Sequence, residues 1–382
     1  MNSIVIRRTL RILVVVIVAA LVVVGAGSVY MLNYSLYPGL NKGRDIAASY
    51  DRLFHSYPYL EVWVDSLRDA GALQDLYLTD DGLILDGPST QGGQQMPSST
   101  GNHSLHALYI PAAQPTGNTA IVIHGYTDCA VNMLMIGRIY SHALGYNVLL
   151  PDLHGHGLSY GDDIRMGWLD RLDVLSWADE ISRLLGDDAR MVVHGISMGA
   201  ATTMMLAGEV EHGEVEHGEV RHGEVERGEV ERDADQPRPY LRCFVEDCGY
   251  TSVWDEFAYE LRGIFHLPAF PLMYSTSLLC RLRLGWSFGE ASALRQVEQC
   301  TRPMLFIHGD ADTYVPTAMV YPLYEAKPEP KELWVVPGVA HAQAFKTFPE
   351  EYTQRVCDFV RRYLPDDCAT LTGEQVEDTA PL

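Results

Sequence analysis

Short apolar runs recur along this chain, and longer stretches with the apolar spacing of helices separate most of them. Strands that are buried on both faces and joined through helices of roughly ten or more residues are typical of a mostly parallel sheet covered by helices on both faces. We therefore predict an α/β fold with a mostly parallel, eight-stranded sheet. The strands are expected at residues 76–78, 105–110, 120–123, 147–150, 191–194, 243–246, 304–308 and 333–336.

The length of the chain accommodates one large domain. Of the 382 residues, 47% are hydrophobic, which suffices for a single core once the N-terminal segment is set aside. We assign residues 73–366 to this domain and residues 367–382 to a C-terminal tail. The formal net charge of -22 argues against nucleic acid or anionic lipid as a ligand, because both repel a negative surface. The sequence leaves the oligomeric state open.

The N-terminal segment has the composition of a membrane-spanning helix. Residues 12–32 are almost uninterruptedly apolar and carry no charge, and as a helix they are long enough to cross a hydrocarbon core of about 30 Å. Arg7, Arg8 and Arg11 precede the run, which favours a cytoplasmic N-terminus. We predict a cell-membrane anchor in residues 1–34, with the following domain outside the cytoplasm.

A cleaved signal peptide is the alternative interpretation of the same segment. Small residues at positions 25–28 follow the most apolar part of the run and could form a cleavage site, which would give a secreted or periplasmic protein. The run nevertheless continues to Leu32, and Tyr30 and Tyr34 have the positions of interfacial aromatic residues. We therefore favour the uncleaved anchor.

Residues 35–72 connect this segment to the domain. Residues 44–54 and 59–70 have the apolar spacing of helices, and Pro58 separates them. We predict two linker helices that shield the start of the sheet.

Two segments lack the periodicity of helices and strands. Residues 86–104 are rich in Gly, Ser, Gln and Pro and are predicted to form a flexible hairpin loop between the first two strands. Residues 208–232 repeat five-residue units such as Gly-Glu-Val-Glu-His, a period that fits neither a helix nor a strand face. We predict a solvated, disordered insertion over residues 208–236. Its histidines fit no established metal-ligand geometry: His212, His217 and His222.

The most specific signal is Gly-Ile-Ser-Met-Gly at residues 195–199, between an apolar strand and a run of helix-forming residues. A serine on a sharp turn from strand to helix needs small neighbours, because the backbone there is strained and closely packed, and Gly195 and Gly199 provide that room. The N-terminus of the helix favours the negative charge that develops in acyl transfer. We therefore predict Ser197 as a nucleophile.

A second loop follows the predicted strand at residues 120–123. The sequence His-Gly-Tyr-Thr begins there at His124, and this is the place for a donor to an oxyanion. In acyl transfer the carbonyl oxygen becomes an anion, and two backbone N–H groups must already point towards it. We predict the N–H groups of Tyr126 and Met198 for this role and interpret His124 as a buried residue that braces the loop.

Two later loops supply candidates for an acid and a base. The strand at residues 304–308 leads to Asp310 and Asp312, at the edge of the sheet where ligands bind in open parallel folds. We choose Asp312 as the acid and interpret Asp310 as a turn residue that bonds its own backbone. His341 follows the last strand and is the predicted general base. The chain order Ser197, Asp312, His341 is the order expected of this fold.

At this point the chain resembles the α/β-hydrolase superfamily, especially its serine-aminopeptidase-like and monoacylglycerol-lipase-like branch. The resemblance covers roughly residues 73–364. It includes Pro-Asp-Leu-His-Gly-His-Gly-Leu-Ser at residues 151–159, which looks like the branch's Asp-x-Arg-Gly-His-Gly-x-Ser segment, with His154 where Arg is usual. The resemblance implies a cap at about residues 250–300, which is rich in large apolar residues. Pro268 and Pro271 should divide it into two short helices.

The cap residues that could contact substrate are Phe257, Leu261 and Phe265, although their helical spacing is more often a sign of packing. The resemblance and the motifs together imply a serine hydrolase of a carboxylic ester, with a small acyl-ester or peptide-like substrate. A serine peptidase with the same triad is the alternative, and a non-catalytic binding protein on the same fold is a third interpretation. This chemistry requires no cofactor and no metal.

Overall fold

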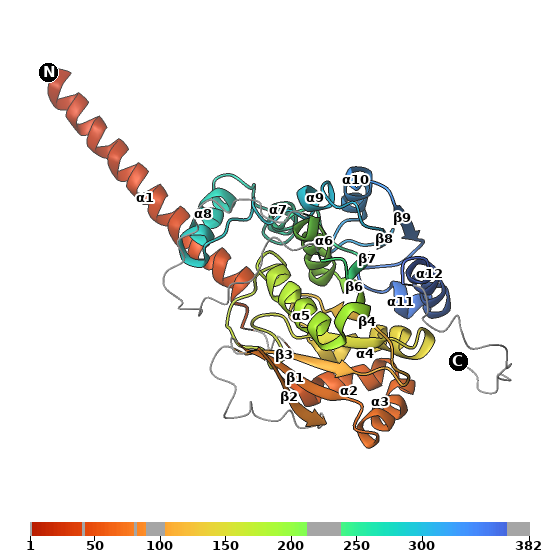
Figure 1. The fold of residues 1–382 in the computed structure, drawn as a ribbon. Coiled ribbons are helices and arrows are strands. Elements are labelled where there is room, and N and C mark those ends of the chain that lie inside the picture. The colour runs from red at the N-terminus through yellow and green to blue at the C-terminus, as the bar shows by residue number, and fades with distance from the viewer. Residues whose placement is uncertain (1, 40–42, 80–81, 89–103, 212–237, 365–382) are drawn as a thin grey trace.

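The computed structural model of the chain is shown in Figure 1. It describes residues 2–39, 43–79, 82–88, 104–211 and 238–364. Most of the predicted pentapeptide insertion and the whole of the predicted tail at 367–382 therefore lie outside the described residues.

A single mixed sheet forms the centre of the described molecule. Its nine strands are arranged in the order β2-β1-β3-β5-β4-β6-β7-β8-β9, and β5, β4, β6, β7, β8 and β9 are mutually parallel. The first three strands pair antiparallel at one edge. The strands are β1 (Gln74–Thr79), β2 (Gly82–Pro88), β3 (Leu105–Ile110), β4 (Asn118–Ile123), β5 (Asn147–Pro151), β6 (Arg190–Ile196), β7 (Leu241–Asp247), β8 (Met304–Gly309) and β9 (Lys331–Val336).

The predicted α/β fold and all eight predicted strands are confirmed, and the structure adds a ninth strand. The additional strand, β2, forms a hairpin with β1 and includes residues that we predicted to be loop. The prediction of a loop from residue 86 was wrong in this part, because pairing with β1 outweighs the low strand propensity of Gly and Pro at residues 87 and 88. Residues 89–103 of that predicted loop lie outside the described residues.

Helices cover both faces of the sheet, as the apolar runs predicted, and each face has its own buried apolar cluster. One cluster involves α5 (Asp170–Leu185), α6 (Met198–Glu211), α9 (Ala293–Val297) and α10 (Val320–Ala326). The other involves α2 (Ile46–Ser56), α3 (Tyr59–Asp69), α4 (Leu134–Arg138), α11 (Ala344–Thr347) and α12 (Pro349–Arg361). Because both faces of the sheet are covered, a substrate can reach only the ends of the strands and the loops that follow them.

Helix α6 extends further than the sequence suggested. We predicted that the irregular insertion begins at Gly208, but residues 208–211 continue the helix. A Cβ atom at Gly208 would lie 2.1 Å from the side-chain oxygen of Gln296 on α9, so the glycine allows α6 to approach α9 closely. Tertiary packing therefore overrides the low helix propensity of glycine at this position.

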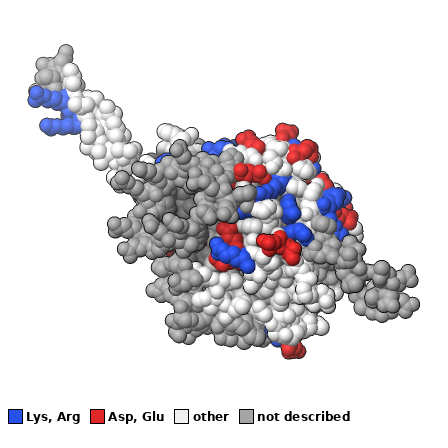
Figure 2. Space-filling model, in the orientation of Figure 1, with Lys and Arg blue, Asp and Glu red and all other residues white. Residues whose placement is uncertain are grey.

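Helix α1 (Asn2–Leu36) is a long rod, most of which projects from the body of the molecule (Figure 1). Its segment Ile6–Leu36 is long and apolar enough to cross a membrane, a property that membrane anchors and signal sequences share. Figure 2 shows this projecting part as an uncharged shaft with basic residues near its tip. Two further helices, α7 (Val253–Phe265) and α8 (Leu272–Leu284), occupy the predicted cap region, and α8 lies alongside the end of α1.

Candidate active site

Ser197 stands on the sharp turn between β6 and α6. Its φ of 58° lies in the left-handed region, which is strained for a residue with a side chain. The two flanking glycines make this turn possible. A Cβ atom at Gly195 would lie 2.0 Å from the carbonyl oxygen of Gly199, and one at Gly199 would lie 2.2 Å from that of Ile123. The backbone N–H of Ser197 donates to the backbone carbonyl of Asp247, which fixes the turn to β7.

The structure brings the three predicted side chains together, although they are far apart in the chain. The Nε2 atom of His341 lies 2.8 Å from the Oγ atom of Ser197, and its Nδ1 atom lies 2.7 Å from the Oδ2 atom of Asp312. Asp312 follows β8 and His341 follows β9, so adjacent parallel strands deliver the acid and the imidazole to the same edge of the sheet. This arrangement can take a proton from the serine hydroxyl and stabilise the resulting imidazolium.

The carboxylate of Asp312 is held rigidly and remains ionised. Its Oδ1 atom accepts hydrogen bonds from the backbone N–H groups of Tyr314 and Val315, which leaves Oδ2 for His341. Burial by itself raises the pKa of this carboxyl, but hydrogen bonds from His308 and His341 outweigh that effect and lower the pKa to about 2. Asp312 is therefore charged at neutral pH.

Asp310 has a different partner from the one that we predicted. Its side chain accepts a hydrogen bond of 2.6 Å from the backbone N–H of Gly338, in the loop that leads to His341. The interpretation of Asp310 as a residue that bonds its own backbone was therefore wrong. The loops after β8 and β9 lie side by side, and the carboxylate links them, which helps to hold His341 in place.

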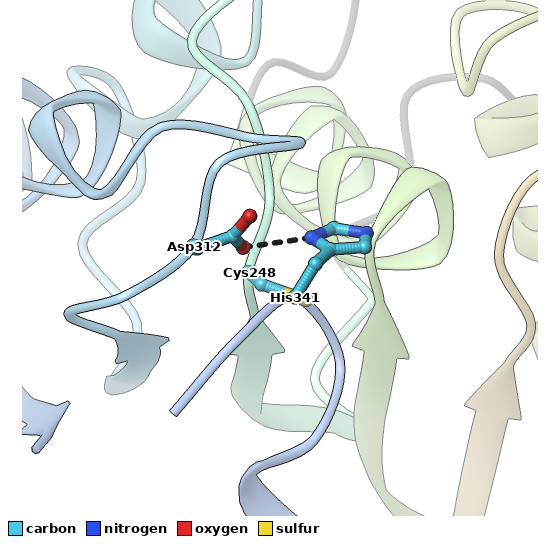
Figure 3. A group of neighbouring side chains, drawn as sticks. All are labelled: Cys248, Asp312 and His341. Carbon is cyan, nitrogen blue, oxygen red and sulfur yellow. Dashed lines mark hydrogen bonds and ion pairs between the residues drawn. The ribbon is translucent and has the colours of Figure 1, made fainter. Parts of the chain in front are cut away.

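Two residues that sequence reasoning missed also contact this group. His308 is buried on β8, and its Nε2 atom lies 3.0 Å from the carbonyl oxygen of Val315 and 3.4 Å from Asp312. Cys248 lies beside Asp312 and His341 (Figure 3), and ligand atoms of these three residues lie within 4.8 Å of one another. A histidine at the end of a strand, four residues before the predicted acid, was the available signal for His308.

The cluster of Cys248, Asp312 and His341 does not have the chemistry of a metal site. A cysteine binds a metal as the thiolate, and burial raises the pKa of the Cys248 thiol well above its usual value. The oxygen atoms of Asp312 already accept two backbone N–H groups and the imidazole. The thiol of Cys248 is therefore protonated, and Asp312 and His341 already bond to other groups. These three residues do not suit a metal ion.

The predicted oxyanion donors lie on the two segments that flank Ser197. Met198 is the first residue of α6, so its backbone N–H has no partner within the helix. The loop that carries Tyr126 is close to the nucleophile, because a Cβ atom at Gly125 would lie 3.4 Å from the Cβ atom of Ser197. His124 braces this loop: its Nδ1–H donates to the carbonyl of Gly125, and its Nε2 accepts from the backbone N–H of Leu153.

A largely apolar cavity of about 800 Å³ begins at Ser197 and Met198. All three predicted substrate-contact residues, Phe257, Leu261 and Phe265, line it. The last turns of α1 supply another part of its wall, which the sequence did not reveal. These lining residues of α1 and the segment that follows it are Tyr30, Met31, Asn33, Tyr34, Ser35, Tyr37, Pro38 and Gly39.

A second cavity of about 500 Å³ lies on the other side of the nucleophile. Ser197, Tyr126, Thr127 and Tyr314 line both cavities, so the serine stands between them. The second cavity also has His341 in its wall and is more polar than the first. Its polar and charged lining includes Arg52, Asp128, Asn132, Gln343 and Lys346. A substrate that reacts at Ser197 can thus place an apolar part and a polar part in separate spaces.

Comparison with known proteins identifies the family and the fold. A model of the alpha/beta hydrolase family matches residues 120–358. The Bacillus subtilis (strain 168) uncharacterized protein YqkD is 28% identical over 252 residues, which are 66% of this chain and 74% of that protein. The Mycobacterium tuberculosis protein Rv2307c is 28% identical over 264 residues, 69% of this chain and 75% of that protein. The Pyrococcus furiosus esterase Pf2001 shares the fold with a TM-score of 0.52 and 22% identity, over 77% of this chain and 94% of that chain.

Proposed function

Because the chain belongs to the alpha/beta hydrolase family, we propose that it is a serine hydrolase that cleaves carboxylic esters through an acyl-enzyme on Ser197. The observation that carries this proposal is the continuous relay of hydrogen bonds from Ser197 through His341 to Asp312. Serine is a weak nucleophile at neutral pH, so it needs a base within hydrogen-bonding distance, and the base needs a group that fixes its tautomer.

In the acylation step, the Oγ atom of Ser197 forms a bond to the ester carbonyl carbon while His341 takes the serine proton. The N–H groups of Tyr126 and Met198 stabilise the oxyanion. When the bond to the alcohol oxygen breaks, His341 gives the proton to the alcohol, which leaves. Water then attacks the acyl-enzyme in the same way and releases the carboxylic acid and free Ser197. The atoms and protons balance without any cofactor.

The two cavities favour an ester with an apolar acyl group and a more polar alcohol. The large apolar cavity suits the acyl chain, and the polar cavity on the side of His341 suits the leaving group, which must receive its proton from this residue. We therefore place the acyl chain against Phe257, Leu261 and Phe265.

A peptidase would use the same three residues, and Glu256 and Glu260 in the apolar cavity are the groups that could bind a peptide's amino terminus. Burial raises the pKa of both carboxyls, that of Glu256 to about 8. Glu256 is therefore mostly neutral at pH 7, which favours the ester. Comparing p-nitrophenyl esters of increasing chain length with aminoacyl-p-nitroanilides decides between the two, and faster turnover of the anilides would contradict our choice.

The Ser197→Ala variant tests the assignment of the nucleophile. It should lose labelling by a fluorophosphonate probe and ester turnover while it keeps the wild-type circular dichroism spectrum and unfolding midpoint. Labelling of this variant at the wild-type rate would refute the proposal. Ser176, a helix α5 serine whose hydroxyl donates to the carbonyl of Leu172, offers a control, and Ser176→Ala should be labelled normally.

We further propose that α1 is an uncleaved anchor in the cell membrane and that the catalytic domain lies outside the cytoplasm. The packing of α1 supports this proposal, since a Cβ atom at Gly27 would lie 3.1 Å from the side chain of Leu272 and the hydroxyl of Ser28 donates to that of Ser275. Cleavage at residues 25–28 would remove or disrupt these contacts. Extraction of membranes with alkaline carbonate should leave the full-length protein in the pellet, and a soluble product that begins near Ser28 would support the secreted alternative instead.

A further inference from the structure

The end of α1 is at once the wall of the apolar cavity and the predicted boundary of the membrane span. Tyr30 and Tyr34 contact the ring of Phe265 edge-on, with ring centroids 6.5 and 5.4 Å apart. The hydroxyl of Tyr126 donates to the carbonyl of Ser35, so the predicted oxyanion loop is bonded directly to this helix. The end of α1 therefore forms part of the active site, in addition to attaching the domain to the membrane.

The depth of these contacts follows from the geometry of the helix. An α-helix rises 1.5 Å per residue, so the uncharged run from residue 12 to residue 32 spans about 30 Å, the thickness of the hydrocarbon core. With Arg11 at one interface, the other interface lies near Leu32. Gly27, which contacts Leu272 at the start of α8, then lies roughly 7 Å inside the hydrocarbon core.

The start of α8 and the preceding loop have the surface that such a position requires. Phe270 is 72% exposed, and the exposed residues Tyr274, Leu278 and Leu282 follow it at intervals of four, which places them along one side of α8. Met273, Thr276 and Cys280, on another side of the same helix, are buried. Ile264 on α7 and Leu267 in the segment between α7 and α8 are also exposed. We call these six residues together the apolar stripe: Ile264, Leu267, Phe270, Tyr274, Leu278 and Leu282.

The cavity reaches the surface beside this stripe. Its inner end contains Ser197, which is 8% exposed, whereas its lining residues Tyr30 and Ile264 are 56% and 51% exposed. Tyr30 precedes Leu32 by two residues, or about 3 Å along the helix, so the opening lies at the level of the bilayer surface. Arg262, Arg281 and Arg283 are exposed nearby, which makes this region more basic than the chain as a whole.

We propose that the apolar stripe is embedded in the outer boundary of the bilayer and that the enzyme takes an acyl ester of a membrane lipid directly from it. This inference rests on the proposed function. The acyl chain enters between α1 and α7, the ester carbonyl meets Ser197, and the polar alcohol of the lipid occupies the second cavity. Such a substrate does not have to cross water, and the insertion depth agrees with that of interfacial helices, about 5–10 Å.

The test uses the full-length protein in phosphatidylcholine vesicles and compares two substrates. One is a long-chain fluorogenic acylglycerol embedded in the same vesicles, and the other is p-nitrophenyl acetate in solution. The double variant Phe270→Glu/Leu278→Glu places charge on the stripe without altering any lining residue of the cavity. We expect its turnover of the embedded ester to fall at least about tenfold, while turnover of the soluble ester and labelling by a fluorophosphonate stay at wild-type levels.

Leu184→Glu is the matched control, because Leu184 is an apolar residue on α5 that is 53% exposed and remote from the stripe in the chain. An equal loss with Leu184→Glu and with the double variant would overturn the inference. So would wild-type turnover of the embedded ester no faster than that of Ser197→Ala, in a protein that still cleaves the soluble ester. Loss of both activities and of labelling in the wild-type protein would instead overturn the proposed function itself.

Discussion

At the scale of single residues, the site depends on which of two nearby carboxylates touches the imidazole. Asp312 lies 2.7 Å from the Nδ1 atom of His341, whereas Asp310 bonds the backbone of Gly338. The two residues are close in sequence and of the same type, and they differ in the partner that the loops after β8 and β9 bring to each. This difference makes them a matched pair for an experiment.

Asp312→Asn should lower kcat by about three to four orders of magnitude, because an amide at this position favours the wrong tautomer of His341. Asp310→Asn should keep most of the activity, since an amide oxygen can still accept from the N–H of Gly338. Steady-state kinetics with a p-nitrophenyl ester measures both variants. Equal losses in the two variants would show that the carboxylates have been assigned wrongly.

Glu246 makes a prediction about stability and pH. It is fully buried on β7; its Oε2 atom accepts from the N–H of Gly249, and its Oε1 atom has no hydrogen-bond partner among the described residues. Burial raises the pKa of this carboxyl from 4.5 to about 8. The folded protein therefore binds a proton that the unfolded chain releases, and stability falls as the pH rises from about 4.5 to about 8.

Glu246→Gln removes this titration. The free energy of unfolding of the variant should rise relative to that of the wild type between pH 5 and 8, by at most about 1.4 kcal/mol per pH unit. Urea unfolding at several pH values measures the difference. A difference that is the same at pH 5 and pH 8 would mean that Glu246 is ionised in the folded protein.

At the scale of elements, two glycines within helices have opposite roles. Gly208 on α6 has Gln296 so close that an added Cβ atom would lie 2.6 Å from its backbone oxygen. Gly263 on α7 has no neighbouring atom within 4 Å of that position. Glycine is therefore required for packing at position 208, whereas at position 263 it only lowers the helix propensity of α7.

Gly208→Ala should therefore destabilise the protein by about 1–3 kcal/mol, because α6 and α9 must separate. Gly263→Ala should stabilise it by about 0.5–1 kcal/mol through better helix propensity. Thermal or urea unfolding of the two variants measures the effects. A stabilising Gly208→Ala would show that α6 is not packed in this way.

At the scale of the whole molecule, α1 joins the proposed membrane anchor to the active site. Leu32 and Leu36 are fully buried in the same apolar cluster as Met198 and Leu261. Most of the helix before Gly27 is exposed and makes no comparable contribution to the core. The two parts of α1 should therefore respond differently to truncation.

Deletion of residues 1–24 should leave folding and short-chain ester turnover close to those of the full-length protein in detergent. Deletion of residues 1–38 removes Leu32, Leu36 and the carbonyl of Ser35 that accepts from the hydroxyl of Tyr126, and should cost about 3 kcal/mol or more in stability. It should also open the apolar cavity and reduce the preference for long acyl chains. Equal stability of the two truncated proteins would contradict the packing described here.

The features that the sequence determined by itself are those with a local cause. Short apolar runs, separated by stretches with the apolar spacing of helices, predicted the eight strands. These periodicities are set by the backbone within a few residues. Gly195 predicted the strained turn at Ser197 from a local cause, because the clash that it avoids is with Gly199, four residues along the chain. The room that Gly199 provides is for the carbonyl of Ile123, a contact that only the folded chain brings about. The candidate acid and base could be chosen because each directly follows an apolar strand, at the edge where parallel strands end.

Other features depend on segments far apart in the chain, and only the tertiary structure decided them. The wall that α1 gives to the cavity joins residues near 30 to residues near 260, and neither segment carries a periodic signal for the other. The hydrogen bond from the N–H of Gly338 to Asp310, the ninth strand and the helical state of Gly208 also depend on partners that local propensity does not specify. The physical reason is that contact energies between distant segments outweigh local preferences of about 1 kcal/mol or less once the chain is compact.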